Sequence, residues 1–157
     1  MEKKLSKFEI LEKEISDMVK KTGDSSLNNK LKSFRIYIGI AISSAIITFL
    51  VAIGNDIPKE GALIIKIIIL LFSGTSTILA AWDGFYNHKQ LWINYGETRN
   101  QLSSLELKLK MLDEKEKLDD KKLDKIFEEY QEILSNGNHK WKQMRLEDKE
   151  SNNHKNA

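Results

Sequence analysis

Residues 36–53 have the sequence IYIGIAISSAIITFLVAI, a run of 18 positions without a charged side chain. As an α-helix this run extends about 27 Å at about 1.5 Å per residue, close to the thickness of the hydrocarbon layer of a membrane. Residues 62–82, ALIIKIIILLFSGTSTILAAW, form a second apolar run, in which Lys66 is the only charged residue. The two runs predict two transmembrane helices rather than two buried helices of a soluble core. We expect the Lys66 ammonium to snorkel to the lipid headgroups, with a role in a pore or in lipid sensing as the alternative.

The segment between the two runs, GNDIPKEG at residues 54–61, contains the only proline of the chain and a glycine at each end. This composition is typical of a tight turn, so the spans are expected to form an antiparallel hairpin in the lipid bilayer. Basic residues gather on the outer flanks of the spans: they are Lys20, Lys21, Lys30, Lys32, Arg35, Lys89 and Arg99, against Lys59 alone in the turn. By the positive-inside rule both termini are predicted to be cytoplasmic. The predicted fold class is an all-α membrane protein with cytoplasmic amphipathic and coiled-coil helices.

Charge is concentrated outside this hairpin, because residues 36–82 hold two of the 25 Lys and Arg and two of the 23 Asp and Glu. The absence of cysteine excludes a disulfide scaffold and a thiolate metal site, and a net charge of +2 gives no reason to expect nucleic-acid binding. The histidines His88, His139 and His154 share no motif, and no glycine-rich phosphate loop occurs. We therefore predict no enzyme, no metal site and no cofactor.

The two ends of the chain are polar. Residues 1–29 are predicted to form a cytoplasmic amphipathic helix, because apolar residues recur there at helical spacing. These residues are Phe8, Leu11, Ile15 and Met18. The helix is expected to end within KTGDSSLNNK at 21–30, which is rich in turn-forming residues. Residues 136–157 have no sustained period and are predicted to form a polar, disordered tail.

Residues 83–135 are predicted to form a cytoplasmic helical region with a heptad repeat. The repeat positions are Leu91, Tyr95, Thr98, Leu102, Leu105, Leu109 and Leu112, resumed by Leu123, Ile126, Tyr130 and Ile133. Two alternatives stay open: one straight helix, or a break near residues 118–120, with Asp119 or Asp120 capping a second helix that folds back. The break is preferred, because it lets the two apolar stretches bury each other and cover the amino-terminal helix.

Small and hydroxyl residues inside the spans are the distinctive polar feature of the sequence. They include Ser43, Ser44 and Thr48 in the first span and Ser73, Thr75, Ser76 and Thr77 in the second. Such residues let transmembrane helices pack closely and bond to each other. Alternatively, a ring of copies turns them toward a water-filled path. The block at 73–77 covers more of the helix circumference than one packing seam needs, which favours a second interface, either between subunits or onto a lumen.

After the second span the chain continues with WINYGETRNQLSSLELKLK at residues 92–110. With the hairpin and its short turn, this segment resembles the SLATT domain, a two-transmembrane effector associated with SMODS nucleotidyltransferases and SLOG sensors in bacterial conflict systems. The similarity covers roughly residues 30–133. It rests on Trp92, Tyr95, Arg99, Leu102, Leu105 and Glu106.

The resemblance implies a homo-oligomeric, pore-forming effector in the bacterial inner membrane that disrupts the membrane of an infected cell. Its trigger would be a nucleotide signal or a partner protein. Because the chain has no nucleotidyltransferase, SLOG or peptidase domain, we expect a separately encoded sensor or nucleotide-synthase partner. The rival function is a non-conducting, membrane-anchored helical scaffold or a subunit of a larger membrane assembly. We expect Trp92, Tyr95 and Arg99 to couple the cytoplasmic helices to the spans, with an ordinary interfacial anchor as the alternative.

Overall fold

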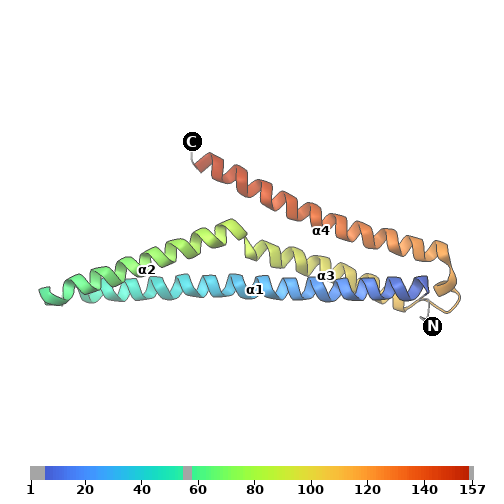
Figure 1. The fold of residues 1–157 in the computed structure, drawn as a ribbon, viewed down its shortest axis with the longest axis horizontal. Coiled ribbons are helices and arrows are strands. Elements are labelled where there is room, and N and C mark those ends of the chain that lie inside the picture. The colour runs from blue at the N-terminus through green and yellow to red at the C-terminus, as the bar shows by residue number, and fades with distance from the viewer. Residues whose placement is uncertain (1–5, 55–57, 156–157) are drawn as a thin grey trace, which may run out of the picture. The chain divides into compact units, whose positions relative to one another are not determined.

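The computed structural model describes residues 6–54 and 58–155, which contain helices and no strand. The elements in chain order are α1 (Lys7–Ile53), α2 (Lys59–Tyr86), α3 (His88–Lys110), a short 3₁₀ helix (Glu116–Leu118) and α4 (Asp120–Lys155) (Figure 1). They form two compact units. The hairpin unit is Lys30–Lys89, and the bundle unit combines Met1–Asn29 with Gln90–Ala157. The all-α fold is therefore as predicted.

The hairpin unit contains the last part of α1 and all of α2, and both helices are long and apolar enough to cross a membrane. Each helix has an 18-residue window that is its most apolar part. In α1, 11% of this window is buried, and in the second helix none of it is, whereas the core helix of a soluble protein is mostly buried. The predicted spans at 36–53 and 62–82 fall within α1 and α2. Part of the predicted turn, residues 55–57, lies outside the described residues. Lys66 is exposed, seven residues after α2 begins.

A narrow stripe of small residues brings the two helices of the hairpin together. A Cβ atom added to Gly39 of α1 would lie 3.0 Å from Leu79 Cδ1 of α2. Ser43, one turn after Gly39, is also buried. Gly39 and Ser43 therefore form a small-xxx-small pair of the kind that permits close helix approach. Large apolar side chains such as Leu70 and Phe49 are more than half exposed on the outer surface, which is the distribution expected of a surface in contact with lipid.

The helix α2 ends at its C-cap residue, Asn87. This residue adopts the left-handed conformation, with φ 48° and ψ 49°, and its N–H donates to the Asp83 carbonyl over 2.8 Å. Such a cap ends a helix, and asparagine tolerates it better than most residues with a side chain. This break was not predicted from the sequence, because a single asparagine between two helical patterns is a weak signal.

The bundle unit packs the first part of α1 with α3 and α4 around one apolar core. Its buried apolar side chains are Leu11, Ile15, Leu102, Leu105, Leu109, Leu112, Leu123, Ile126 and Tyr130. Each of these positions belongs to the repeats recognised in the sequence, so this part of the predicted core face is confirmed, whereas Leu91 and Tyr95 of the same repeat are half-buried. The start of α1 is joined to α4 by ion pairs of Lys7 Nζ with Asp120 Oδ1 (3.3 Å) and Asp124 Oδ1 (2.8 Å).

The connection between α3 and α4 shows which of the two alternatives the chain adopts. α3 ends at Lys110 and α4 begins at Asp120, so the chain breaks and folds back, starting somewhat before residues 118–120. Asp119 Oδ1 accepts the Lys121 N–H at 3.0 Å and caps α4. Asp113 and Glu116 form a reciprocal capping box in the turn, each side chain accepting the backbone N–H of the other at 2.8 and 2.9 Å.

At both ends of the chain the structure departs from the prediction. α1 does not end within residues 21–30 but continues to Ile53. The turn-forming side chains there are satisfied without leaving the helix; for example, the Thr22 hydroxyl donates to the Met18 carbonyl over 2.7 Å. At the other end, α4 continues as a helix through Lys155, where a disordered tail was predicted. Residues 156–157 lie outside the described residues.

Contacts with α3 explain why α4 extends beyond residue 136. The Asn94 side-chain N–H₂ donates to the Gly137 carbonyl over 3.1 Å, and Lys140 Nζ pairs with Glu97 Oε2 over 2.6 Å. These contacts are made by polar residues, so apolar periodicity in the sequence does not reveal them. The helix therefore continues where the apolar repeat has already ended.

Candidate functional site

The hydroxyl residues of the spans divide into two groups in the hairpin unit. Ser43 is 5% exposed, and Ser76 is half-buried one turn before Leu79. Both belong to the stripe where α1 and α2 cover each other, beside the contact between Gly39 and Leu79. These two serines are therefore placed for packing within the hairpin.

The second group is exposed on the outside of the hairpin. It consists of Ser44, Thr48, Ser73, Thr75 and Thr77. The Thr48 hydroxyl donates to the Ser44 carbonyl, and the Thr77 hydroxyl donates to the Ser73 carbonyl, each over 2.9 Å. Bonding to the carbonyl four residues earlier satisfies the donor within its own helix. These two hydroxyl groups are thus compatible with lipid, with another helix and with water.

Four of the exposed hydroxyl residues share one face of the hairpin. Successive helix residues are turned by about 100°, so Ser44 and Thr48 lie about 100° and 140° round α1 from the buried Ser43. Counted in the same sense, Ser73 and Thr77 lie about 60° and 100° round α2 from Ser76. Two antiparallel helices are related by a twofold axis perpendicular to their common plane, so equal rotations lead to the same face of the pair.

Thr75 is on the opposite face, because it is turned by about 100° from Ser76 in the other sense. The block at 73–77 is therefore not one continuous polar surface. It contributes Ser76 to the packing stripe, Ser73 and Thr77 to one outer face, and Thr75 to the other. The excess of polar residues noticed in the sequence lies outside the stripe that the two helices need for each other.

The bundle unit contains a layer of buried polar side chains next to its apolar core. Thr22, Asn94 and Thr98 are 6%, 7% and 8% exposed. The Thr98 hydroxyl donates to the Asn94 carbonyl over 3.0 Å, and the Asn94 amide joins α3 to α4 through the Gly137 carbonyl. A buried hydrogen bond contributes about 1 kcal/mol net, less than a well-packed apolar side chain, but its directionality fixes how the helices meet.

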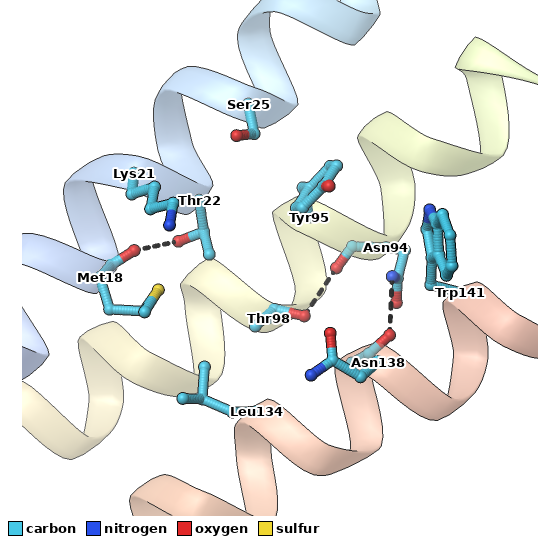
Figure 2. A pocket seen from close by; sticks show the side chains of 11 residues that line it. Met18, Lys21, Thr22, Ser25, Asn94, Tyr95, Thr98, Leu134, Asn138 and Trp141 are labelled. Atoms are coloured by element: carbon cyan, nitrogen blue, oxygen red, sulfur yellow. Dashed lines mark hydrogen bonds between the residues drawn. The ribbon is translucent and has the colours of Figure 1, made fainter. Parts of the chain in front are cut away.

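A pocket of about 470 Å³ opens within this polar layer. Figure 2 shows its walls, which come from α1, α3 and α4, with the Asn94 side chain between α3 and α4. The apolar and aromatic part of the lining is Met18, Tyr95, Leu134 and Trp141. Lys21 is the charged residue of the lining, which contains no acidic side chain. Asn94 Oδ1 is buried and has no hydrogen-bond partner in the described part of the chain.

The three residues predicted to couple the helices to the spans have different environments in the bundle unit. Trp92 is half-buried, and its carbonyl accepts the Ser26 hydroxyl at 2.9 Å. Tyr95 is half-buried and lines the pocket. Arg99 is exposed and lies over α1, where a Cβ atom added to Gly23 would be 3.1 Å from Arg99 Nε. Tyr95 therefore faces the pocket and Arg99 lies against α1, while Trp92 contacts α1 through its backbone carbonyl.

Thr22, Asn94 and Gly137 line the pocket but were not predicted from the sequence as site residues. Asn94 is one residue before the predicted heptad position Tyr95, so the heptad pattern did not include it. The four-residue spacing from Asn94 to Thr98 is the signal that could have placed both on one face. Gly137 offered only the weak signal of a glycine within a helical segment.

His88, the first residue of α3, belongs to the hairpin unit and is 5% exposed. Its ring stacks on Tyr86, with centroids 5.4 Å apart and planes 6° from parallel. Burial lowers the pKa of His88 below its usual value, Lys32 lowers it further, and Asp83 partly opposes both effects. Among the described residues, no three of His, Cys, Asp and Glu gather closely enough to hold a metal ion.

Fold and site define an all-helical protein that combines an apolar two-helix hairpin with a three-helix bundle containing a polar pocket. A family model described as a protein of unknown function, DUF4231, matches residues 21–110, and the chain belongs to this family. No curated protein and no solved structure matches the chain. The matched segment includes both apolar runs and α3, and with them six of the eleven residues that line the pocket.

Proposed function

We propose that this protein is a bacterial inner-membrane effector that self-associates through its hairpin and forms or opens a pore. In both apolar helices little or none of the most apolar window is buried within the structure, which supports insertion into a bilayer. The basic flanks of the spans support an orientation with both termini in the cytoplasm. The similarity to SLATT domains supports a role in a bacterial anti-phage or conflict system.

The observation that carries the proposal is the outer face with Ser44, Thr48, Ser73 and Thr77. A hairpin that only anchored the chain would need polar residues for its own packing stripe, and Ser43 already supplies one there. Two spans alone enclose no water, but a ring of copies that turns this face inward would line a path with hydroxyl groups. Interhelical hydroxyl contacts contribute roughly 0.6 to 2 kcal/mol each, so the same face also serves association.

Control of such a pore is assigned to the bundle unit. A difference of a few kcal/mol between two helix arrangements is enough to invert their populations. Trp92, Tyr95 and Arg99 are the proposed coupling residues, because each contacts or faces another helix of the bundle beside the polar layer. The trigger in this proposal is a separately encoded sensor or nucleotide-synthase partner.

One observation favours the rival function, a non-conducting membrane-anchored scaffold. The hydroxyl protons of Thr48 and Thr77 are already bonded within their own helices, so both residues tolerate lipid as well as water. A scaffold of this kind would insert and associate in the same way but would not release ions or dye.

Dye release from liposomes distinguishes the two functions. The full chain is reconstituted, and Ser73→Ala with Thr77→Val is compared with Thr75→Val, which removes a hydroxyl at similar depth on the opposite face. We expect the double variant to reduce release at least tenfold, corresponding to about 1.4 kcal/mol, and Thr75→Val to behave like the wild type.

Protease protection of the inserted hairpin confirms that each variant has the same orientation before release is compared. Equal release by the two variants would contradict a hydroxyl-lined path on the proposed face. No release by correctly inserted wild-type protein, alone or with a separately encoded sensor or nucleotide-synthase partner, would support the scaffold instead.

A further inference from the structure

The pocket of the bundle unit has the size and lining of a small-molecule site. Its volume of about 470 Å³ falls within the roughly 300–1,000 Å³ typical of ligand pockets. Met18 and Leu134 provide apolar surface, while Tyr95 and Trp141 provide aromatic rings. Flat aromatic molecules suit such a lining, because they bury much apolar area and stack against rings.

Two hydroxyl groups that line the pocket have their protons bonded within their own helices. The hydroxyl protons of Thr22 and Thr98 are donated to the Met18 and Asn94 carbonyls of their own helices. The Asn94 side-chain N–H₂ donates to the Gly137 carbonyl, and this bond fixes the orientation of the amide. Asn94 is 7% exposed, and its Oδ1 is a buried acceptor without a hydrogen-bond partner in the described part of the chain. A bound molecule that carries an N–H donor therefore matches this unpartnered acceptor.

The charge of the pocket lining favours an anionic group on the ligand, in addition to the N–H donor. Lys21 is exposed beside the pocket, and no acidic side chain lines it. An anionic group near Lys21 gains a favourable charge interaction and meets no carboxylate. A cationic ligand would meet only the like charge of Lys21.

We propose that this pocket binds a small planar aromatic acid whose ring N–H donates to Asn94 Oδ1 and whose carboxylate lies near Lys21. Because the lining residues come from α1, α3 and α4, the bound molecule bridges all three helices of the bundle (Figure 2). It thereby stabilises the arrangement in which α4 is packed on α3. This binding involves the bundle unit alone and is independent of whether the spans conduct.

Isosteric pairs of probes test the donor directly on the wild-type chain in nanodiscs. The probes are indole-2-carboxylate and indole-5-carboxylate, each compared with the benzofuran acid of the same shape, in which oxygen replaces the N–H. We expect at least one indole acid to bind at least tenfold more tightly than its benzofuran counterpart, as measured by calorimetry, about the effect of one well-used hydrogen bond.

Fluorine NMR of the chain labelled with 5-fluorotryptophan locates the binding. The Trp141 resonance is expected to shift with the indole acid, while that of Trp82, in the hairpin unit, stays unchanged. Asn94→Leu should abolish the preference for indole over benzofuran. Asn100→Leu, at an exposed position of α3 outside the pocket, should retain it.

Two results would overturn the proposal. Equal affinity of the wild-type chain for both members of each pair would mean that Asn94 Oδ1 accepts no ligand hydrogen bond. No binding of either indole acid up to roughly millimolar concentration, about −4 kcal/mol, would mean that the acceptor is satisfied by water alone. Both results come from the wild-type chain and do not depend on the folding of a variant. Dye release is measured separately, so failure here leaves the pore proposal standing.

Discussion

Gly137 of α4 is the position where adding one carbon atom should loosen the bundle most clearly. A Cβ atom there would lie 2.9 Å from Thr98 Oγ1 and 3.5 Å from Thr98 Cγ2. The backbone of Gly137 is helical, so alanine is excluded by lack of space and not by conformation. Thr98 cannot yield easily, because it is 8% exposed and its hydroxyl is bonded to the Asn94 carbonyl.

Gly96 of α3 provides the matched control. A Cβ atom added there would lie 3.5 Å from Ser26 Oγ, which is an ordinary van der Waals contact. Both glycines are in helix interiors, where Gly→Ala alone stabilises a helix by about 1 kcal/mol. Overpacking at Gly137 costs about 1–3 kcal/mol in addition. We therefore expect Gly96→Ala to stabilise by roughly 0.5–1 kcal/mol and Gly137→Ala to be between neutral and about 2 kcal/mol destabilising.

Native-state hydrogen exchange of the full chain in nanodiscs measures both effects locally. In Gly137→Ala, amides of α4 around residue 137 should exchange up to roughly thirtyfold faster than in the wild type, since 1.4 kcal/mol corresponds to a factor of ten. In Gly96→Ala, amides of α3 should exchange a few times more slowly. The opposite outcome is that α4 gains as much protection in Gly137→Ala as α3 gains in Gly96→Ala. That result would refute the close contact with Thr98.

Three further perturbations address the core, the coupling residue and the buried histidine. Leu105→Ala, at a position 2% exposed, should destabilise the bundle by about 2–5 kcal/mol, measured as faster proteolysis of the bundle relative to the wild type. If Arg99 couples the bundle to the spans, Arg99→Gln should change triggered dye release. Gly23→Ala should push the flexible Arg99 side chain aside and change the release in the same direction. Wild-type release by the Gly23→Ala variant alone would argue against coupling through this contact. Because the pKa of His88 is lowered in the folded chain, the neutral form stabilises the α2–α3 junction above about pH 6.5, and this stability is lost as the pH falls from there toward the folded-state pKa. In the wild type this loss should appear as faster amide exchange at the junction below about pH 6.5. His88→Gln should abolish the effect, whereas His139→Gln, at an exposed position, should leave it unchanged.

Much of the fold follows from apolar spacing in the sequence. The two apolar runs lie within α1 and α2, and the predicted heptad residues from Thr98 to Tyr130 are buried. Burial of large aliphatic side chains is the dominant favourable term in folding, so a period that matches a helix predicts the buried face well. The capping residue Asp119 was also among the candidates, because aspartate before a helical pattern is a common helix start.

The interruptions of the helices were harder to predict, because they depend on contacts between distant residues. The segment at 21–30 is rich in turn formers, yet α1 passes through it. Ser26 shows why, since its hydroxyl bonds to the Trp92 carbonyl, 66 positions away in sequence. Conversely, Asn87 breaks the helix with a single left-handed residue, and nothing in the flanking sequence requires it.

The polar layer was hidden from sequence reasoning for a related reason. Asn94 and Thr98 look like surface residues of an amphipathic helix, since polar side chains are seldom fully buried. They are buried because Gly137 lets α4 approach α3 and because its carbonyl accepts the Asn94 amide. This fit between Gly137 of one helix and Asn94 and Thr98 of another depends on both helices, so the periodicity of either helix alone does not predict it. In the spans, by contrast, composition alone revealed the polar residues, and the fold was needed only to sort them by face.

The two parts of α4 are held to the bundle by different forces. Leu123, Ile126 and Tyr130 are buried in the apolar core, where each fully buried side chain contributes about 1.5–3 kcal/mol. Beyond Leu134 the contacts with α3 among the described side chains include the Asn94 hydrogen bond, the contact at Gly137 and an exposed ion pair, and exposed ion pairs contribute little. Local opening should therefore begin in the second part of α4 while the core stays intact. A molecule bound in the pocket acts on this same weak part, because its walls include α4 as well as α1 and α3. The polar layer thus gives the bundle a weakly held segment on which a bound molecule can act, and a purely apolar bundle would lack such a segment.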